Sequence, residues 1–259
     1  MKFTQEKSEG GVTERFFELS VAGMPVPGTL WAPEGARGPR PLLLMGHGGG
    51  QHRMFAPFAA SARRYARDLE YAVVAIDAPS HGARATPDES ARFAENFRRQ
   101  MASSGGLGGE ALKIMVQLAA QAGPEWRALI DEVQSLDFVG TRGPVAYIGL
   151  SLGAMIGIPL VASEPRIRAA IFGLAGLREG ETPALEAAAR QLAVPVEFLA
   201  QWDDELVPRA DAMALFDAIG SAEKTLHANP GGHGGVPMFE RHGWIQFVIR
   251  HLGTVTVPS

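Results

Sequence analysis

The sequence predicts one α/β domain whose mostly parallel β-sheet is covered by helices on both faces. Strand-like and helix-like stretches alternate along most of the 259 residues, and no internal repeat is visible. Parallel strands need helical crossovers, so this alternation favours a doubly covered sheet over a sandwich or a bundle. Hydrophobic residues make up 46% and charged residues 20%, which is typical of a packed globular chain. A single domain of this length is common among α/β proteins.

Eight strands and two sheet-covering helices are expected from local patterns. The two early strands, at 14–21 and 26–32, are joined by a turn around Gly23 to Pro25. Later strands are shorter and more continuously apolar, as buried parallel strands are; they are expected at 41–45, 71–76, 144–149, 168–174, 195–200 and, more weakly, 223–228. Apolar residues at helical spacing predict helices at 54–70 and 243–252.

The stretch 83–140 is too long for a simple crossover between two strands. Helices are expected at 88–101, at 110–122 and at 124–136, where a proline occupies the first turn. The third helix can serve as the crossover, which leaves the first two as a helical insert after the fourth expected strand. We expect residues 83–123 to cap a site, with the glycine-rich stretch 103–109 as a hinge. Decoration of the sheet edge is the alternative.

Residues 143–163 form an apolar run without a charged side chain, long enough in principle for a transmembrane helix. It is interrupted by Gly149, Gly153, Gly157 and Pro159, and its first half is strand-like. A buried strand followed by a buried helix therefore explains the run better than a membrane span.

Composition narrows the function classes. The formal net charge of −4 argues against nucleic acid as the main partner, because phosphate binding favours a basic surface. The chain has no cysteine, which excludes disulfides, thiolate metal sites and a cysteine nucleophile. The first eleven residues contain no apolar signal-peptide core. A cytoplasmic location fits these features, and no membrane partner is expected.

The segment Gly149-Leu150-Ser151-Leu152-Gly153 matches the pattern G-x-S-x-G. A nucleophilic serine must project from a sharp strand-to-helix turn, and the two glycines let strand and helix approach without a clash. The preceding residues VAYIG are strand-like, and the following GAMIG suits a helix packed closely on a sheet. The sequence therefore predicts Ser151 as a nucleophile.

With three further motifs in the same chain order, the sequence resembles the α/β-hydrolase family of serine esterases. The segment 201–208, QWDDELVP, is similar to the family's acid loop, whose Asp-x-x-Val-Pro register selects Asp204 over Asp203. The segment 229–235, NPGGHGG, is similar to its histidine loop and selects His233. The segment 46–50, GHGGG, is similar to its oxyanion loop, and 77–82, DAPSHG, to a recurrent segment of the family.

The resemblance implies a serine-dependent hydrolase of small-molecule carboxylic esters that needs no cofactor. Ser151, His233 and Asp204 would be nucleophile, base and acid, and the backbone N–H groups of Leu152 and Gly49, with Gly48 as a third candidate, would hold the oxyanion. In size the chain is similar to the dienelactone-hydrolase-like branch, whose name-giving enzymes use cysteine instead. Peptidase, amidase, thioesterase and carbon–carbon hydrolase chemistry at the same serine stay open, as does a non-catalytic receptor.

Two large apolar residues beside the expected triad, Trp202 and Met155, are candidates for lining the substrate pocket, although either could be ordinary core. No metal site is expected. His47 and His52 lie five residues apart without flanking carboxylates, so His47 is interpreted as a brace for the oxyanion loop. His227 lies in the last expected strand and is interpreted as packed or exposed. Sequence patterns do not determine the identity of the substrate or the oligomeric state.

Overall fold

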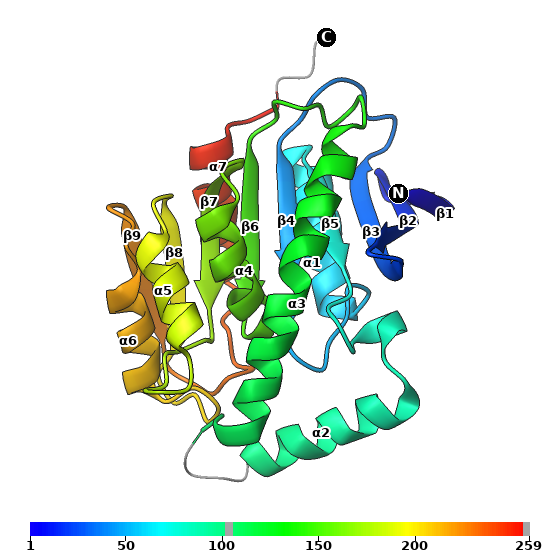
Figure 1. Ribbon diagram of the computed structural model, residues 1–259. Helices are drawn as coiled ribbons and strands as arrows, with labels where there is room; N and C mark the ends of the chain where they lie inside the picture. The colour runs from blue at the N-terminus through cyan, green and yellow to red at the C-terminus, as the bar shows by residue number, and fades with distance from the viewer. Residues whose placement is uncertain (102–105, 256–259) are drawn as a thin grey trace.

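A nine-stranded sheet forms the centre of the protein in the computed structural model, which describes residues 1–101 and 106–255 (Figure 1). The strand order is β1-β2-β3-β5-β4-β6-β7-β8-β9. The first three strands pair antiparallel and β3 joins β5 antiparallel, whereas all pairs from β5 to β9 are parallel. The strands are β1 (Lys2–Glu9), β2 (Val12–Val21), β3 (Met24–Pro33), β4 (Leu42–Gly46), β5 (Ala72–Ile76), β6 (Val145–Leu150), β7 (Ile167–Gly173), β8 (Val196–Gln201) and β9 (Lys224–Asn229).

The expected parallel α/β architecture is confirmed, but the expected number of eight strands is wrong by one. The missed strand is β1, and all eight of its residues are exposed. It is held by backbone pairing with β2, from Lys2 opposite Glu18 to Glu9 opposite Val12. An edge strand of this kind buries no side chain and therefore leaves no hydrophobic pattern in the sequence.

Helices cover both faces of the sheet (Figure 1). One face packs against α3 (Gly109–Gln134), α4 (Leu152–Ser163), α5 (Pro183–Gln191) and α6 (Arg209–Ala218). The other face packs against α1 (Ala56–Leu69) and α7 (Glu240–Leu252), which bury Tyr65 and Phe247 among other side chains. Alternate residues of each buried strand point into these two layers, which explains their continuous apolar sequences.

The insert differs from its prediction. A short turn, η1 (Gly82–Arg84), leads into α2 (Pro87–Met101), which extends across the lower part of Figure 1. The two helices expected at 110–122 and 124–136 are one helix, α3, with Pro124 inside it. Proline removes only one helical hydrogen bond, and the buried side chains of Ala122 and Trp126 hold the helix on both sides of it. No element boundary therefore marks the expected end of the insert at residue 123.

The apolar run at 143–163 and the glycine-rich stretch at 103–109 were the two other features expected from the sequence. The apolar run 143–163 is a buried strand, β6, followed by a buried helix, α4, with Pro159 inside it. Within 1–101 and 106–255, no helix combines the length and apolar character needed to cross a membrane. Of the expected hinge, residues 103–105 lie outside the described part of the chain.

Candidate functional site

Ser151 lies at a sharp turn between β6 and α4. Its φ of +56° is in the left-handed region, which is rarely adopted by residues other than glycine. The flanking glycines permit this turn: a Cβ on Gly149 would lie 2.5 Å from the Gly153 carbonyl oxygen, and one on Gly153 would lie 2.4 Å from that of Gly46. Both contacts are with backbone, so neither position can accept a side chain without displacing the turn. The Ser151 N–H donates to the Gly173 carbonyl at 2.8 Å, which fixes the turn against β7.

His233 connects Ser151 to Asp204. The Nε2 atom of His233 lies 3.1 Å from the Ser151 Oγ, and its Nδ1 lies 2.8 Å and 3.0 Å from the two Asp204 carboxylate oxygens. The His233 side chain is 12% exposed and that of Asp204 only 1%. The three predicted residues, from loops after β6, β8 and β9, thus form one chain of hydrogen bonds with the hydroxyl at its open end.

The acid loop positions its three consecutive acidic residues for different contacts. Asp204 Oδ1 accepts hydrogen bonds from the N–H groups of Leu206 and Val207 at 2.8 and 2.9 Å. Asp203 instead points to the histidine loop, where its Oδ2 accepts from the Gly231 N–H at 3.0 Å. The predicted choice of Asp204 therefore matches the observed contact with His233.

Glu205 is a site residue that the sequence reasoning missed. Its Oε2 accepts a hydrogen bond from the backbone N–H of His233 at 2.9 Å. A Cβ on Gly232 would lie 2.5 Å from the same oxygen, so a side chain at this position would displace the Glu205 carboxylate. Glu205 thus anchors the histidine loop to the acid loop, and only its position beside Asp204 hints at this in the sequence.

The loop after β4 is braced by His47, as expected. Its Nδ1 lies 2.9 Å from the Gly48 carbonyl, and its Nε2 accepts from the Ala78 N–H at 3.0 Å. These partners require a neutral ring with the proton on Nδ1, since a carbonyl only accepts and an amide only donates. Burial lowers the pKa of His47 to about 4, which agrees with a neutral side chain.

A narrow cavity of about 70 Å³ leads to Ser151 and His233. Gly49 lines it, and so does Met155, one of the two predicted pocket residues. Trp202, the other, is 39% exposed and is not among the lining residues; the guanidinium of Arg209 stacks on its ring at 4.0 Å. On the same measure one water needs about 10–15 Å³, so the cavity has room for a small organic group.

The three predicted oxyanion donors differ in position. Leu152 is the first residue of α4, where backbone N–H groups have no partner within the helix. Gly49 faces the same cavity as Ser151. Gly48 is not among the residues that line it; its carbonyl accepts from the Gln51 N–H at 3.2 Å. Gly49, which lines the cavity, and Leu152, whose N–H directly follows Ser151 at the start of α4, are therefore the better placed pair.

The insert supplies much of the cavity wall, chiefly apolar side chains of α2 and α3: Phe93, Ala111, Leu112, Ile114 and Met115. Phe93 also borders a second, open hollow of about 810 Å³ between the loops after β4 and β5. A Cβ on Gly49 would lie 2.8 Å from the Phe93 ring, so this ring packs directly on the loop after β4. Phe93 therefore lies at the boundary between the cavity and the open hollow. Sequence patterns did not single out Phe93.

Comparisons with known proteins place these features in context. No protein-family model matches the chain, and no curated protein matches it by sequence. Among solved structures, the PEG-bound complex of a cold-adapted esterase from an Arctic intertidal metagenomic library is 31% identical, covers 97% of this chain and all of that one, and has a TM-score of 0.77.

Two more distant structures share the fold. An acetyl xylan esterase from Paenibacillus sp. R4 is 15% identical, with a TM-score of 0.73 and coverage of 97% of this chain and 88% of that one. Est1E from Butyrivibrio proteoclasticus with bound ferulic acid is 16% identical, with a TM-score of 0.67 and coverage of 92% of this chain and all of that one.

Proposed function

The chain belongs to the serine esterases of the α/β-hydrolase family and is a carboxylic ester hydrolase, and we propose that it acts on small-molecule esters through an acyl-enzyme on Ser151. The observation that carries this assignment is the continuous hydrogen-bond chain from the Ser151 hydroxyl through His233 to Asp204. A serine hydroxyl is a weak nucleophile at neutral pH and needs a base at this distance.

Acylation begins when the Ser151 Oγ attacks the ester carbonyl carbon and His233 Nε2 takes the hydroxyl proton. Asp204 accepts the Nδ1 proton of His233 in a hydrogen bond, which holds the productive tautomer and stabilises the imidazolium as it forms. The tetrahedral intermediate then collapses, its carbon–oxygen bond to the alcohol breaks, and His233 returns the proton to the leaving alkoxide. The products of this half-reaction are the free alcohol and acyl-Ser151.

Deacylation repeats the same proton transfers with water. His233 takes a proton as water attacks the acyl carbon, then returns it to the Ser151 Oγ as the acid is released. In both halves a negative oxygen develops on the former carbonyl, and we assign its hydrogen-bond donors to the N–H groups of Leu152 and Gly49. The left-handed turn at Ser151 places the Leu152 N–H at the start of α4, where the helix dipole favours negative charge.

Matched substrates test the reaction class. For one acyl group presented as an ester, an amide and a thioester, plus a β-diketone for carbon–carbon cleavage, we expect the ester to give the highest kcat/KM. We expect Ser151→Ala to lose this turnover while its circular dichroism spectrum stays unchanged. Faster turnover of another member of the panel would reassign the chemistry, and saturable binding without turnover by folded wild type would indicate a receptor.

We further propose that residues 83–123 cap the site. At one end the Arg84 guanidinium forms two hydrogen bonds of 2.7 Å with the Glu125 carboxylate, which ties η1 to α3. In the middle of the insert, just before α3, the Leu107 N–H donates to the Leu206 carbonyl at 2.6 Å. Leu206 also contributes one of the N–H groups that hold Asp204, so the insert is attached directly to the acid loop. This attachment and the lining contributed by α2 and α3 support a cap over decoration of the sheet edge.

Substitution of Phe93 tests the cap. Phe93→Ala removes the ring that separates the cavity from the outer hollow, so we expect the ratio of kcat/KM for a bulky acyl ester to that for the acetate to rise about tenfold. Arg92→Ala, at the exposed neighbouring position of α2, is the control and should leave the ratio unchanged. An unchanged ratio in Phe93→Ala would favour edge decoration.

A further inference from the structure

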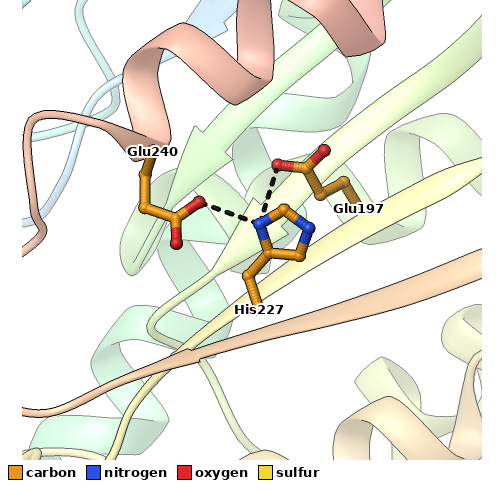
Figure 2. A group of neighbouring side chains, drawn as sticks. All are labelled: Glu197, His227 and Glu240. Carbon is orange, nitrogen blue, oxygen red and sulfur yellow. Dashed lines mark hydrogen bonds and ion pairs between the residues drawn. The ribbon is translucent and has the colours of Figure 1, made fainter.

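Three titratable side chains lie close together on the sheet face that packs against α7. The proposed reaction uses none of them. They are Glu197 of β8, His227 of β9 and Glu240, the first residue of α7. Figure 2 shows both carboxylates directed at the Nδ1 atom of His227. The Glu240 Oε2 lies 2.8 Å from this nitrogen and the Glu197 Oε1 lies 3.7 Å from it.

Among the described residues, the two carboxylates of the cluster form ion pairs with His227 alone. Glu197 and Glu240 are 4% and 5% exposed, and across residues 1–101 and 106–255 neither forms an ion pair with lysine or arginine. When both carboxylates are ionised, one histidine can offset at most one of the two negative charges, and a bound cation would offset the other. Buried charge without a partner is costly.

One ligand atom in the cluster also lacks a hydrogen bond. The Glu197 Oε1 is buried and faces the His227 ring, and no group in residues 1–101 or 106–255 forms a hydrogen bond with it. The Glu240 carboxylate, in contrast, is oriented by a second hydrogen bond. Its Oε1 accepts from the Asn229 side-chain amide at 2.7 Å, which leaves Oε2 directed at His227. Ligating carboxylates around bound metal ions are commonly oriented by such a second hydrogen-bond partner.

We propose that Glu197, His227 and Glu240 bind a divalent transition metal, with Zn²⁺ as the best fit. The three ligand atoms lie within 4.8 Å of one another. One imidazole nitrogen and two carboxylate oxygens suit Zn²⁺, which accepts four-coordinate sites at about 2.0–2.2 Å from such atoms. A hollow of about 250 Å³, lined by Glu197 and His227, gives access from solvent and room for a water as the fourth ligand.

The position of the cluster gives the metal a structural role. Asn229 ends β9 and Glu240 begins α7, so the loop between them, which carries His233, has both of its ends at the cluster. A metal bound there would cross-link β8, β9 and α7 and hold the base of that loop. The sequence expectation of no metal considered only His47 and His52. His227 was interpreted as packed or exposed from its place in the last strand. Its carboxylate partners come from two other elements, so no local pattern marks them.

Titration of chelator-treated, metal-free protein with ZnCl₂ in a calorimeter tests the proposal. We expect one Zn²⁺ per chain with a Kd below about 1 µM, and a rise in Tm of roughly 5–10 °C at a hundredfold excess over Kd. His227→Gln, Glu197→Gln and Glu240→Gln should each weaken binding by at least about tenfold. The control is His242→Gln, an exposed histidine of the same helix, which should bind as wild type does.

Cobalt gives a readout that needs no substitution. Wild-type protein with one equivalent of Co²⁺ should show the visible absorption of four-coordinate cobalt, and Zn²⁺ should displace it. Absence of stoichiometric Zn²⁺ binding to wild type, or binding that survives in all three folded ligand variants, would overturn the proposal. In that case the cluster is a histidine held between two glutamates.

Discussion

We expect Asp204→Asn to lower kcat about 10⁴-fold on an activated ester, equivalent to roughly 5 kcal/mol of barrier. The Asp204 carboxylate lies 2.8 Å from His233 Nδ1 and is almost completely buried, so no solvent replaces its charge. An amide in its place can present an N–H to His233, which favours the wrong tautomer and leaves the imidazolium unstabilised. Steady-state kinetics at one pH provides the measurement.

Asp203→Asn is the matched control, one residue away. The Asp203 Oδ2 accepts a hydrogen bond from the Gly231 N–H, and an asparagine oxygen can accept the same bond. We expect its kcat to stay within about tenfold of wild type. Thermal melts of both variants separate a catalytic loss from a folding loss. If Asp203→Asn, and not Asp204→Asn, showed the large loss of kcat, the assignment of the acid would be wrong by one position.

We expect His47 to make the protein sensitive to acid. Its folded-state pKa is lowered by burial to about 4, below the 6.5 of an unburied histidine. The unfolded chain therefore binds this proton more readily, so the His47 contribution is fully present above pH 6.5. It is lost as the pH falls from 6.5 to 4, at about 1.4 kcal/mol per pH unit and roughly 3 kcal/mol in all. Urea unfolding at a series of pH values measures it.

His47→Gln isolates this contribution from the other titrating groups. Glutamine keeps one donor and one acceptor for Gly48 and Ala78 but does not titrate. We expect the free energy of unfolding of the variant to fall less steeply between pH 6.5 and 4, by about 1 kcal/mol per pH unit. Parallel curves for the variant and wild type would show that His47 titrates alike in the folded and unfolded chains.

The parallel part of the sheet could be predicted from sequence because burial on two faces leaves continuous apolar runs such as 72–76 and 145–149. The strand β1 could not, since its stability comes from backbone pairing that any polar sequence can make. Pro124 was misleading for a related reason. Its local signal for a helix start is real, but packing of the flanking side chains overrides it.

At the site, the choice of Asp204 could be predicted because the spacing of its motif has a structural cause. The Asp-x-x-Val-Pro register places two backbone N–H groups on Asp204, those of Leu206 and Val207, and so orients the carboxylate. Trp202 was predicted to line the pocket only because it is near Asp204 in sequence, and this proximity does not fix where its side chain points. The ring is partly exposed and stacks with Arg209. Contacts across separate loops, such as Glu205 with the His233 N–H, depend on packing that no local pattern encodes.

Covalent labelling of Ser151 tests the central claim most directly. A fluorophosphonate probe should add once per wild-type chain by intact mass, and peptide mapping should place the adduct on Ser151. Ser151→Ala should take up no probe, because no other serine is held 3.1 Å from the Nε2 of His233 within the described residues. An adduct on a different serine, or folded wild type that neither reacts with the probe nor hydrolyses esters, would contradict the account.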